Sequence, residues 1–314
     1  MPEGRGEFEK AGRVYAALAT PRRPNSTEAD TAALLDYLDP IASAGVNGLV
    51  LFGATGEFIH FEIEERIRVA GLAIKRSRVP LLVNASHSTL AGAIALAEHA
   101  IDNGASGILL TPPYFYRYGE AQIYEFYSRF VDALGGSAPI YLYNLAPFLN
   151  PISPELAIRL LETGAFAGIK DSSGDWDQFA RLLEYRREHD FRLLVGNDAV
   201  YLRGRSAGAD GIVSGVAAAL PELIVAMDQA VLTGDRARAE SLDGRLREFL
   251  AYVERFPSPL AIRQAGAVRG WNLKHSAVPL DEDTAAEVIR FHGWFREWLP
   301  EVLAECGVPA PVRS

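Results

Sequence analysis

The sequence predicts an α/β protein built as a (β/α)8 barrel, a TIM barrel, with a helical appendix at its C-terminus. Two observations predict this class: a short glycine pattern recurs along the chain, and short apolar runs alternate with amphipathic segments. Composition agrees with both, because 49% of the 314 residues are hydrophobic and 23% are charged, the balance of an ordinary globular protein. A chain of this size can bury a large core, which excludes disorder for most of it.

The glycine pattern consists of two glycines, three positions apart, followed by Leu or Ile. It begins at Gly45, Gly104 and Gly208, and it returns with one extra residue at Gly164. The first glycine of each copy can adopt the left-handed conformation that ends a helix, and the second allows a tight turn into a strand. Since the copies at Gly45, Gly104 and Gly164 stand about 60 residues apart, each of these two intervals holds two strand–helix units of ~30 residues.

Short apolar runs supply the strands, as expected for parallel strands that are buried on both faces. The expected strands are Arg13–Ala19, Asn47–Phe52, Pro80–Asn84, Gly107–Leu110, Pro139–Tyr143, Ala167–Lys170, Arg192–Val195 and Gly211–Ser214. Eight alternating units predict a closed barrel. An open, doubly wound sheet is the alternative, but it would favour a G-x-G-x-x-G turn that the sequence lacks.

The segments between the strands have helical periodicity. The apolar face of the segment Glu62–Arg78 consists of Ile63, Ile67, Ala70 and Ile74. Acidic residues at its start and basic residues at its end match the helix dipole. The segment Ser88–Asn103 has Ser88 or Thr89 as its N-cap and Gly104 as its stop.

The barrel is expected to end near Gly234. Residues 1–234 would then hold the barrel and its active site, and residues 235–314 would form helices packed on it. The expected helical segments are Arg236–Arg255, a segment from Pro257 with the breaker Pro259, and Glu282–Leu299. No linker rich in Pro, Gly or Ser separates them from the barrel, which favours an appendix over an independent domain.

Charge and cysteine content exclude several classes of protein. Asp and Glu outnumber Lys and Arg by 40 to 31, and a net charge of −9 argues against nucleic acid as the main partner. Cys306 is the one cysteine, so intramolecular disulfides and Cys-rich zinc sites are excluded. We expect no membrane span, because no window holds 18 consecutive apolar residues. The polar segment Met1–Gly12 lacks the apolar core of a secretory signal, so the expected compartment is the cytoplasm.

Two residues at expected strand ends carry the chemistry, since the catalytic groups of such barrels lie at the carboxyl ends of the strands. Lys170 and Tyr143 end neighbouring strands. A buried lysine is disfavoured as an ammonium, and the free amine can form a Schiff base with a ketone. Tyr143 would be an acid/base beside it. The alternatives are a lysine that faces solvent and a tyrosine packed in the core.

A third strand end carries the loop Gly53-Ala54-Thr55-Gly56-Glu57. Its glycines allow a ligand to approach closely, and its backbone N–H groups with the Thr55 hydroxyl could hold a carboxylate. An ordinary tight turn between strand and helix is equally compatible with this pattern.

Taken together, these residues resemble the dihydrodipicolinate synthase / N-acetylneuraminate lyase family of class I aldolases, which form a Schiff base with pyruvate. The resemblance runs from about Arg13 to Leu299 in the order and spacing of the family. The motifs are Gly53-x-Thr55-Gly56-Glu57, Thr111-Pro112-Pro113-Tyr114, Tyr143-Asn144, Gly168-Ile169-Lys170-Asp171 and Gly211-Ile212-Val213-Ser214.

The resemblance implies a role for each matching residue. Lys170 would attack the carbonyl of pyruvate or another 2-keto acid, Tyr143 would shuttle protons, and Tyr114 would reach into the site of a neighbouring subunit. The carboxylate would be bound by the Gly53, Ala54 and Thr55 loop. Gly196 and Val213 would line the pocket with backbone groups. The resemblance also implies a homotetramer, a dimer of dimers, that needs no metal or organic cofactor.

Two departures from the family pattern concern the substrate. Ala54 replaces a residue that usually carries a hydroxyl, so water or another hydroxyl must complete the proton relay. Phe148 stands where the synthases have an arginine that binds the carboxylate of aspartate semialdehyde. Its loss should cost several kcal/mol of binding. We therefore expect a less charged aldehyde, either sugar-derived or aromatic. His87 is a further candidate to contact its distal part, and the favoured alternative is a histidine at the solvated rim or in a local hydrogen bond.

The main hypothesis is thus a lyase or aldolase that acts on a 2-keto acid, such as a 2-keto-3-deoxy-sugar acid, by aldol cleavage, condensation or dehydration. One alternative is a 4-hydroxy-tetrahydrodipicolinate synthase, which joins pyruvate and aspartate semialdehyde. Another is a catalytically silent sensor or scaffold that binds a keto acid. A phosphate-binding barrel is the least favoured, because Ser214-Gly215-Val216 is a poor phosphate loop.

Overall fold

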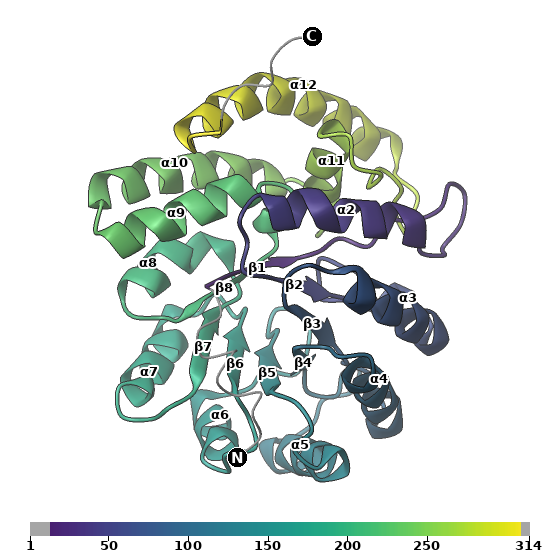
Figure 1. Ribbon diagram of the computed structural model, residues 1–314, viewed down its shortest axis with the longest axis vertical. Helices are drawn as coiled ribbons and strands as arrows, with labels where there is room; N and C mark the ends of the chain where they lie inside the picture. The colour runs from purple at the N-terminus through teal and green to yellow at the C-terminus, as the bar shows by residue number, and fades with distance from the viewer. Residues whose placement is uncertain (1–12, 309–314) are drawn as a thin grey trace.

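The computed structural model describes residues 13–308. Its centre is a closed barrel of eight parallel strands, β1 to β8, arranged in chain order. β8 pairs with β1, with Val213 opposite Tyr15, and this pairing excludes the open sheet. The predicted fold class is confirmed (Figure 1). The expectations for residues 1–12 and 309–314 lie outside the described residues.

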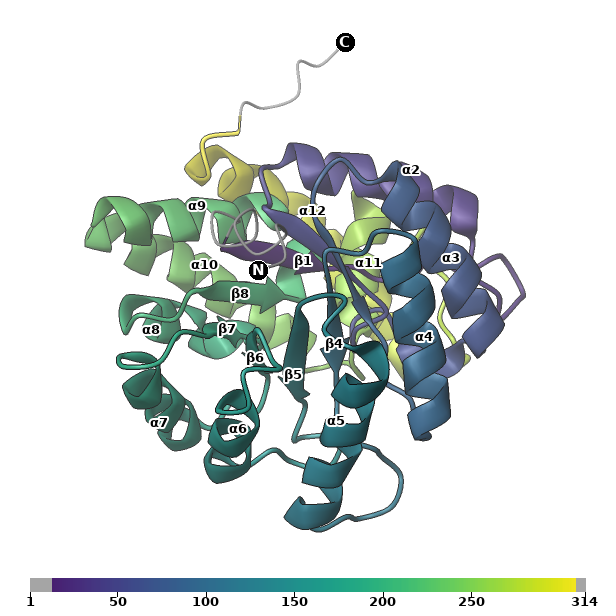
Figure 2. The same cartoon turned by 60° about the horizontal axis from the view of Figure 1, so that its bottom comes forward.

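The strands are short and fully or nearly fully buried. They are β1 Val14–Ala17, β2 Gly48–Leu51, β3 Leu81–Asn84, β4 Gly107–Leu110, β5 Ile140–Asn144, β6 Gly168–Asp171, β7 Arg192–Val195 and β8 Gly211–Ser214. Each overlaps the strand expected from the sequence, and three have the expected bounds. Rotation of the molecule shows helices around the outside of the strands (Figure 2).

The two positions of the repeated pattern require glycine for different structural reasons. The first of each copy has a positive φ, 93° at Gly45 and 91° at Gly104, as expected of a helix stop. The second begins a strand, and there the requirement is space rather than a tight turn. A Cβ at Gly168 would lie 2.1 Å from the Arg192 carbonyl oxygen, and one at Gly211 would lie 2.1 Å from the Arg13 carbonyl oxygen.

This crowding gives a stability prediction for Gly168→Ala. The new methyl group would collide with the backbone of β7, so we expect a loss of about 3 kcal/mol or more in the free energy of unfolding. Gly244→Ala is the control, because it lies inside a helix where a Cβ has open space, and there alanine should be neutral or stabilising. Urea titrations of the two variants check the prediction, and equal unfolding midpoints would contradict it.

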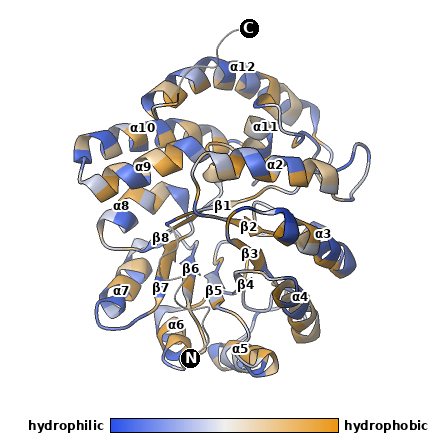
Figure 3. Ribbon diagram, in the orientation of Figure 1, coloured by the Kyte–Doolittle hydropathy of each residue, from blue (hydrophilic) through white to orange (hydrophobic). Residues whose placement is uncertain are grey.

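Eleven α-helices of the described chain surround or extend the barrel. They are α2 Thr31–Ser43, α3 Ile63–Arg76, α4 Leu90–Asp102, α5 Glu120–Leu134, α6 Pro154–Leu161, α7 Trp176–Arg186, α8 Tyr201–Ser206, α9 Pro221–Thr233, α10 Arg236–Val253, α11 Leu260–Val268 and α12 Glu282–Glu305. Hydrophobic residues follow the strands and one side of the helices, with hydrophilic residues on the other side (Figure 3). Within residues 13–308, no helix has the length and apolar character needed to cross a membrane.

Helix α3 is turned relative to its predicted face. Its fully buried residues are Arg66, Val69, Ala70 and Ala73, whereas Ile63, Ile67 and Ile74 are only partly buried. The stripe of isoleucines is thus the border of the buried face. An arginine occupies the middle of that face, which a pattern of apolar residues alone could not indicate.

The three helices after α9 pack around aromatic side chains of α10 and α12. Phe249, Phe291 and Phe295 are fully buried there. The predicted end of α12 at Leu299 is wrong, because the helix continues through Pro300 to Glu305. Proline removes one backbone hydrogen bond, but buried Val302 and the ion pairs of Glu305 with Arg245 hold the last turn in place.

Candidate active site

Lys170 and Tyr143 lie side by side inside the barrel, where the sequence placed them. They are register partners on β6 and β5, and the Lys170 Nζ lies 4.0 Å from the centroid of the Tyr143 ring. Lys170 is 3% exposed and Tyr143 is 1% exposed. The Lys170 Nζ lies over the face of the Tyr143 ring, and its charge also acts on the nearby carboxylate of Asp198.

A carboxylate missed in the sequence, Asp198, faces this pair from the end of β7. It accepts hydrogen bonds from Ser214 Oγ and from the Gly215 N–H, the latter at 3.1 Å. Burial raises the pKa of Asp198, and the Ser214 hydroxyl, the N–H groups of Val216 and Gly215, and the charge of Lys170 oppose that rise. The site therefore holds an acid, a lysine and a tyrosine on three successive strand ends. Position after a strand was the available signal, but Asp is also a common turn residue.

The Thr55 loop borders the same space. A Cβ on Gly215 would lie 3.0 Å from Thr55 Oγ1 and 3.7 Å from Asp198 Oδ2, which places the hydroxyl next to the end of β8. Ala54 packs against the apolar cluster of the barrel interior that includes Tyr143 and Val213. The structure thus places Thr55 near the end of β8 and Asp198, and it places Ala54 against the apolar cluster that contains Tyr143.

Two residues at the ends of this loop have strained backbones. Phe52 has φ 56° and Glu57 has φ 54°, a left-handed conformation that costs a non-glycine residue about 1–2 kcal/mol. Asn84 Nδ2 donates to the Phe52 carbonyl at 2.7 Å. Glu57 is held by an ion pair to Arg263 at 2.8 Å. Such strain persists only where the surroundings fix it, and it is typical of functional loops.

Tyr114 follows β4 and contacts the segment after the Thr55 loop. Its ring packs edge-on against Phe58 at 5.8 Å. Burial raises the pKa of Tyr114, an effect that the charge of Arg66 and a hydrogen bond with the Ser88 backbone oppose. Arg66 itself is buried and donates to the carbonyls of Ser86 at 2.9 Å and Asn84 at 2.7 Å, and burial lowers the pKa of Arg66 to about 10.

The remaining predicted residues lie further out or are engaged locally. The Gly196 N–H donates to the Asp171 carbonyl at 2.6 Å, so its backbone joins the ends of β7 and β6. His87 Nδ1 lies 2.9 Å from Thr89 Oγ1, at the start of α4. Phe148 is 65% exposed, at the rim. The structure therefore does not bring His87 or Phe148 into contact with Lys170.

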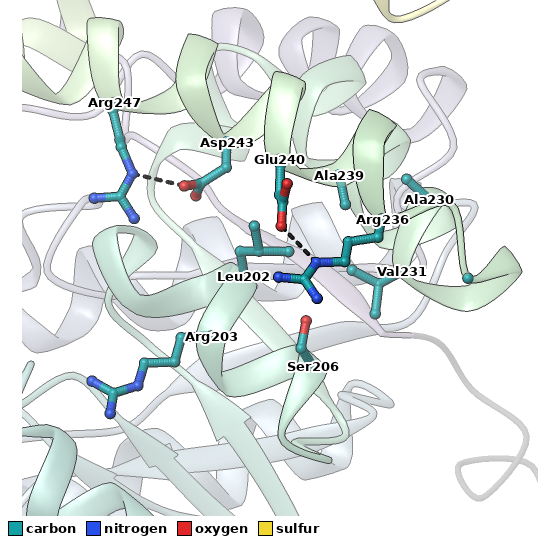
Figure 4. Close-up of a pocket in the computed structure, with 11 residues that line it drawn as sticks. Leu202, Arg203, Ser206, Ala230, Val231, Arg236, Ala239, Glu240, Asp243 and Arg247 are labelled. Atoms are coloured by element: carbon teal, nitrogen blue, oxygen red, sulfur yellow. Dashed lines mark hydrogen bonds and ion pairs between the residues drawn. The ribbon is translucent and has the colours of Figure 1, made fainter.

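A separate surface pocket of about 490 Å³ lies among α8, α9 and α10 (Figure 4). Its charges are largely paired within the protein, Arg247 with Asp243 at 2.7 Å and Arg236 with Glu240 at 2.7 Å. It contains none of the predicted site residues. Among residues 13–308, no cluster of three or more His, Cys, Asp or Glu side chains could hold a metal ion.

Comparison with known proteins agrees with this geometry. The sequence model of the dihydrodipicolinate synthetase family matches residues 10–290. The chain is 30% identical over 280 residues to a 4-hydroxy-tetrahydrodipicolinate synthase of Methanothrix thermoacetophila, covering 88% of this chain and 94% of that one.

Solved structures share the fold. YagE, a prophage protein of the dihydrodipicolinic acid synthase family from E. coli K12 in complex with pyruvate, superposes with a TM-score of 0.83 at 24% identity, over 92% of this chain and 98% of that one. CdNal from Clostridium difficile, in complex with mannosamine, superposes with a TM-score of 0.84 at 16% identity, over 91% and 99% of the two chains. The family match spans most of the chain, including every strand of the barrel, and it includes all the site residues described above. The chain therefore belongs to the dihydrodipicolinate synthetase family, whose members are lyases and aldolases.

Proposed function

We propose that the protein cleaves, forms or dehydrates a 2-keto acid through a Schiff base on Lys170. The observation that carries this proposal is the contact between Lys170 and Tyr143, a buried amine 4.0 Å from the ring of a buried tyrosine. A lysine whose role was only structural would more often lie at the surface or in an ion pair with a carboxylate.

The proposed mechanism assigns a role to Lys170, to Tyr143 and to the Thr55 loop. The free amine of Lys170 attacks the keto carbon, and the resulting carbinolamine loses water to give an imine. Tyr143 donates the proton that the departing oxygen needs and later accepts one from the substrate hydroxyl. The protonated imine then accepts the electron pair of the breaking C–C bond. Thr55 and the N–H groups of its loop bind the carboxylate, which fixes the keto carbon beside Nζ.

The proposed substrates are 2-keto-3-deoxy-sugar acids or related compounds. In support, residues 143–150 contain no Arg or Lys, and exposed Phe148 offers an apolar rim to the second substrate. The alternative, 4-hydroxy-tetrahydrodipicolinate synthase activity, is favoured by the name of the Methanothrix relative. It would need another cation to bind the carboxylate of aspartate semialdehyde.

We also propose that the chain assembles as a homotetramer through contacts at the end of the barrel where the strands terminate and where Lys170 and Tyr143 lie. Phe115 is 87% exposed and Tyr116 is 66% exposed, next to the proposed second tyrosine, Tyr114. Exposed neighbouring aromatic rings are typical of an interface. In such an assembly Tyr114 would complete the proton relay of a partner subunit.

Borohydride trapping tests the proposal. Sodium borohydride reduces an imine to a stable amine. The protein incubated with pyruvate and sodium borohydride should therefore carry one reduced pyruvate adduct, on the peptide that contains Lys170. The same protein without pyruvate is the control. A folded protein that gains no adduct would refute the Schiff base. Trapping without turnover, in a screen of aldehydes with pyruvate fixed, would instead indicate the keto-acid sensor.

A further inference from the structure

The loop that carries Thr55 depends on a residue far away in the sequence. Arg263 lies on α11, in the helices that follow the barrel, and it is 1% exposed. Its Nη1 donates to Glu57 Oε2 at 2.8 Å and to the Thr20 carbonyl at 2.9 Å, and its Nη2 donates to the His275 carbonyl. One guanidinium therefore joins the end of β1, the loop after β2 and the C-terminal segment.

Further contacts hold the loop against the segment that follows β1. Thr20 Oγ1 donates to the Gly56 carbonyl at 2.9 Å. A Cβ at Gly56 would lie 3.0 Å from the Leu18 carbonyl oxygen, so the loop has no room to move toward β1. Glu57 directly follows Gly56 and holds its left-handed conformation while paired with Arg263.

Helix α11 also touches the opposite wall of the site. A Cβ on Gly215 would lie 3.3 Å from Ile262 Cδ1 and 3.0 Å from Thr55 Oγ1. Ile262 and Arg263 are neighbours on α11, which packs between α12 and the barrel (Figure 1). The same turn of helix thus reaches the end of β8 at Gly215 through Ile262 and the loop after β2 at Glu57 through Arg263.

Stability alone is a poor explanation for this cluster. Two buried guanidinium groups, Arg22 and Arg263, share the single carboxylate of Glu57, with Arg22 Nη2 at 3.7 Å. Within the described chain, Nε of Arg263 and both Nε and Nη2 of Arg22 have no hydrogen-bond partner. Burial lowers the pKa of both arginines, and Glu57 opposes that change. Apolar side chains would usually fill such a space at lower cost, so a geometric requirement is the better explanation.

We propose that Arg263 is a positioning residue of the keto-acid site, which fixes the Thr55 loop through Glu57 and makes α11 part of the active-site architecture. This inference rests on the proposed function, in which the Thr55 loop binds the substrate carboxylate. It assigns to the C-terminal helices a role in substrate binding, because loss of the guanidinium would let Glu57 leave its left-handed conformation, and Thr55, two residues earlier in the loop, would move with it.

The experiment compares Arg263→Met with Arg269→Met. Arg269 also lies next to α11 and also ties it to the barrel region, through a bidentate pair with Glu222 at 2.7 and 2.6 Å and a bond to the Ala219 carbonyl at 2.8 Å, but it does not contact the Thr55 loop. Pyruvate-dependent trapping on Lys170 measures the pyruvate concentration that gives half-maximal adduct. We expect Arg263→Met to raise it by about 10- to 100-fold and Arg269→Met to leave it unchanged. Both variants should still reach full trapping at saturating pyruvate, and Arg263→Lys should restore part of the affinity.

Amide hydrogen exchange of residues 53–57, without ligand, is the second measurement. It should be about tenfold faster in Arg263→Met than in the wild type, and unchanged in Arg269→Met. Equal exchange and equal half-maximal pyruvate concentrations in the two variants would overturn the inference, whatever their melting temperatures. If the wild type forms no adduct at all, the proposed function fails, and faster exchange in Arg263→Met alone would still decide whether Arg263 positions the loop.

Discussion

Lys170→Met should abolish pyruvate trapping and lower turnover of the keto-acid substrate by at least about 10⁴-fold. The reason is chemical, since methionine has no amine to form the imine and no other group in the site can replace it as an electron sink. The fold should persist. Methionine fits the space of the lysine stem beside Tyr143, and it removes a charge that is buried in the barrel interior.

Turnover, trapping and melting temperature together test this expectation. Lys75→Met is the matched control, because Lys75 is exposed in the last turn of α3, remote from the barrel interior. That variant should trap pyruvate and turn over substrate like the wild type. If Lys170→Met formed the adduct on a different lysine at the wild-type rate, Lys170 would not be the nucleophile.

The fold was predictable because its signals are local. The helix stop at Gly104 depends on the backbone freedom of glycine, and the glycine three positions later in the sequence marks the start of the next strand. The alternation of such units then leaves few topologies, and a right-handed succession of parallel strands closes after eight of them. Lys170 and Tyr143 were predictable for the same reason, since neighbouring strand ends meet at one mouth of the barrel.

The missed residues depend on contacts between distant segments. Arg66 and Arg263 are buried within helices whose sequence pattern would place arginine at the surface, and each bonds to backbone carbonyls of other elements. Asp198 is recognisable only once Ser214 and Lys170 are known to face it. Helix α12 continues past the predicted end at Leu299, where buried Val302 packs against the core, a contact that the local sequence does not reveal. Sequence patterns indicate which face of an element is buried, and they do not indicate which polar groups the rest of the fold will satisfy there.

Tyr143→Phe should separate proton transfer from Schiff-base geometry. The phenylalanine ring keeps the face against which the Lys170 Nζ lies, at 4.0 Å in the wild type, and loses only the hydroxyl. Without that acid/base, turnover should fall by about 10²–10⁴-fold. Borohydride should still trap pyruvate on Lys170, but more slowly, because imine formation also requires a proton for the departing water.

Tyr127→Phe is the control, for which we expect a loss of stability without a loss of turnover. Its hydroxyl is fully buried and donates to the Leu110 carbonyl at 2.9 Å, outside the candidate site. Loss of that bond should lower the free energy of unfolding by about 1 kcal/mol and leave turnover unchanged. If Tyr143→Phe kept turnover within a factor of about three of the wild type, another group would have to carry the proton. Asp198, which faces Lys170 from the end of β7, would then be the acid to replace next.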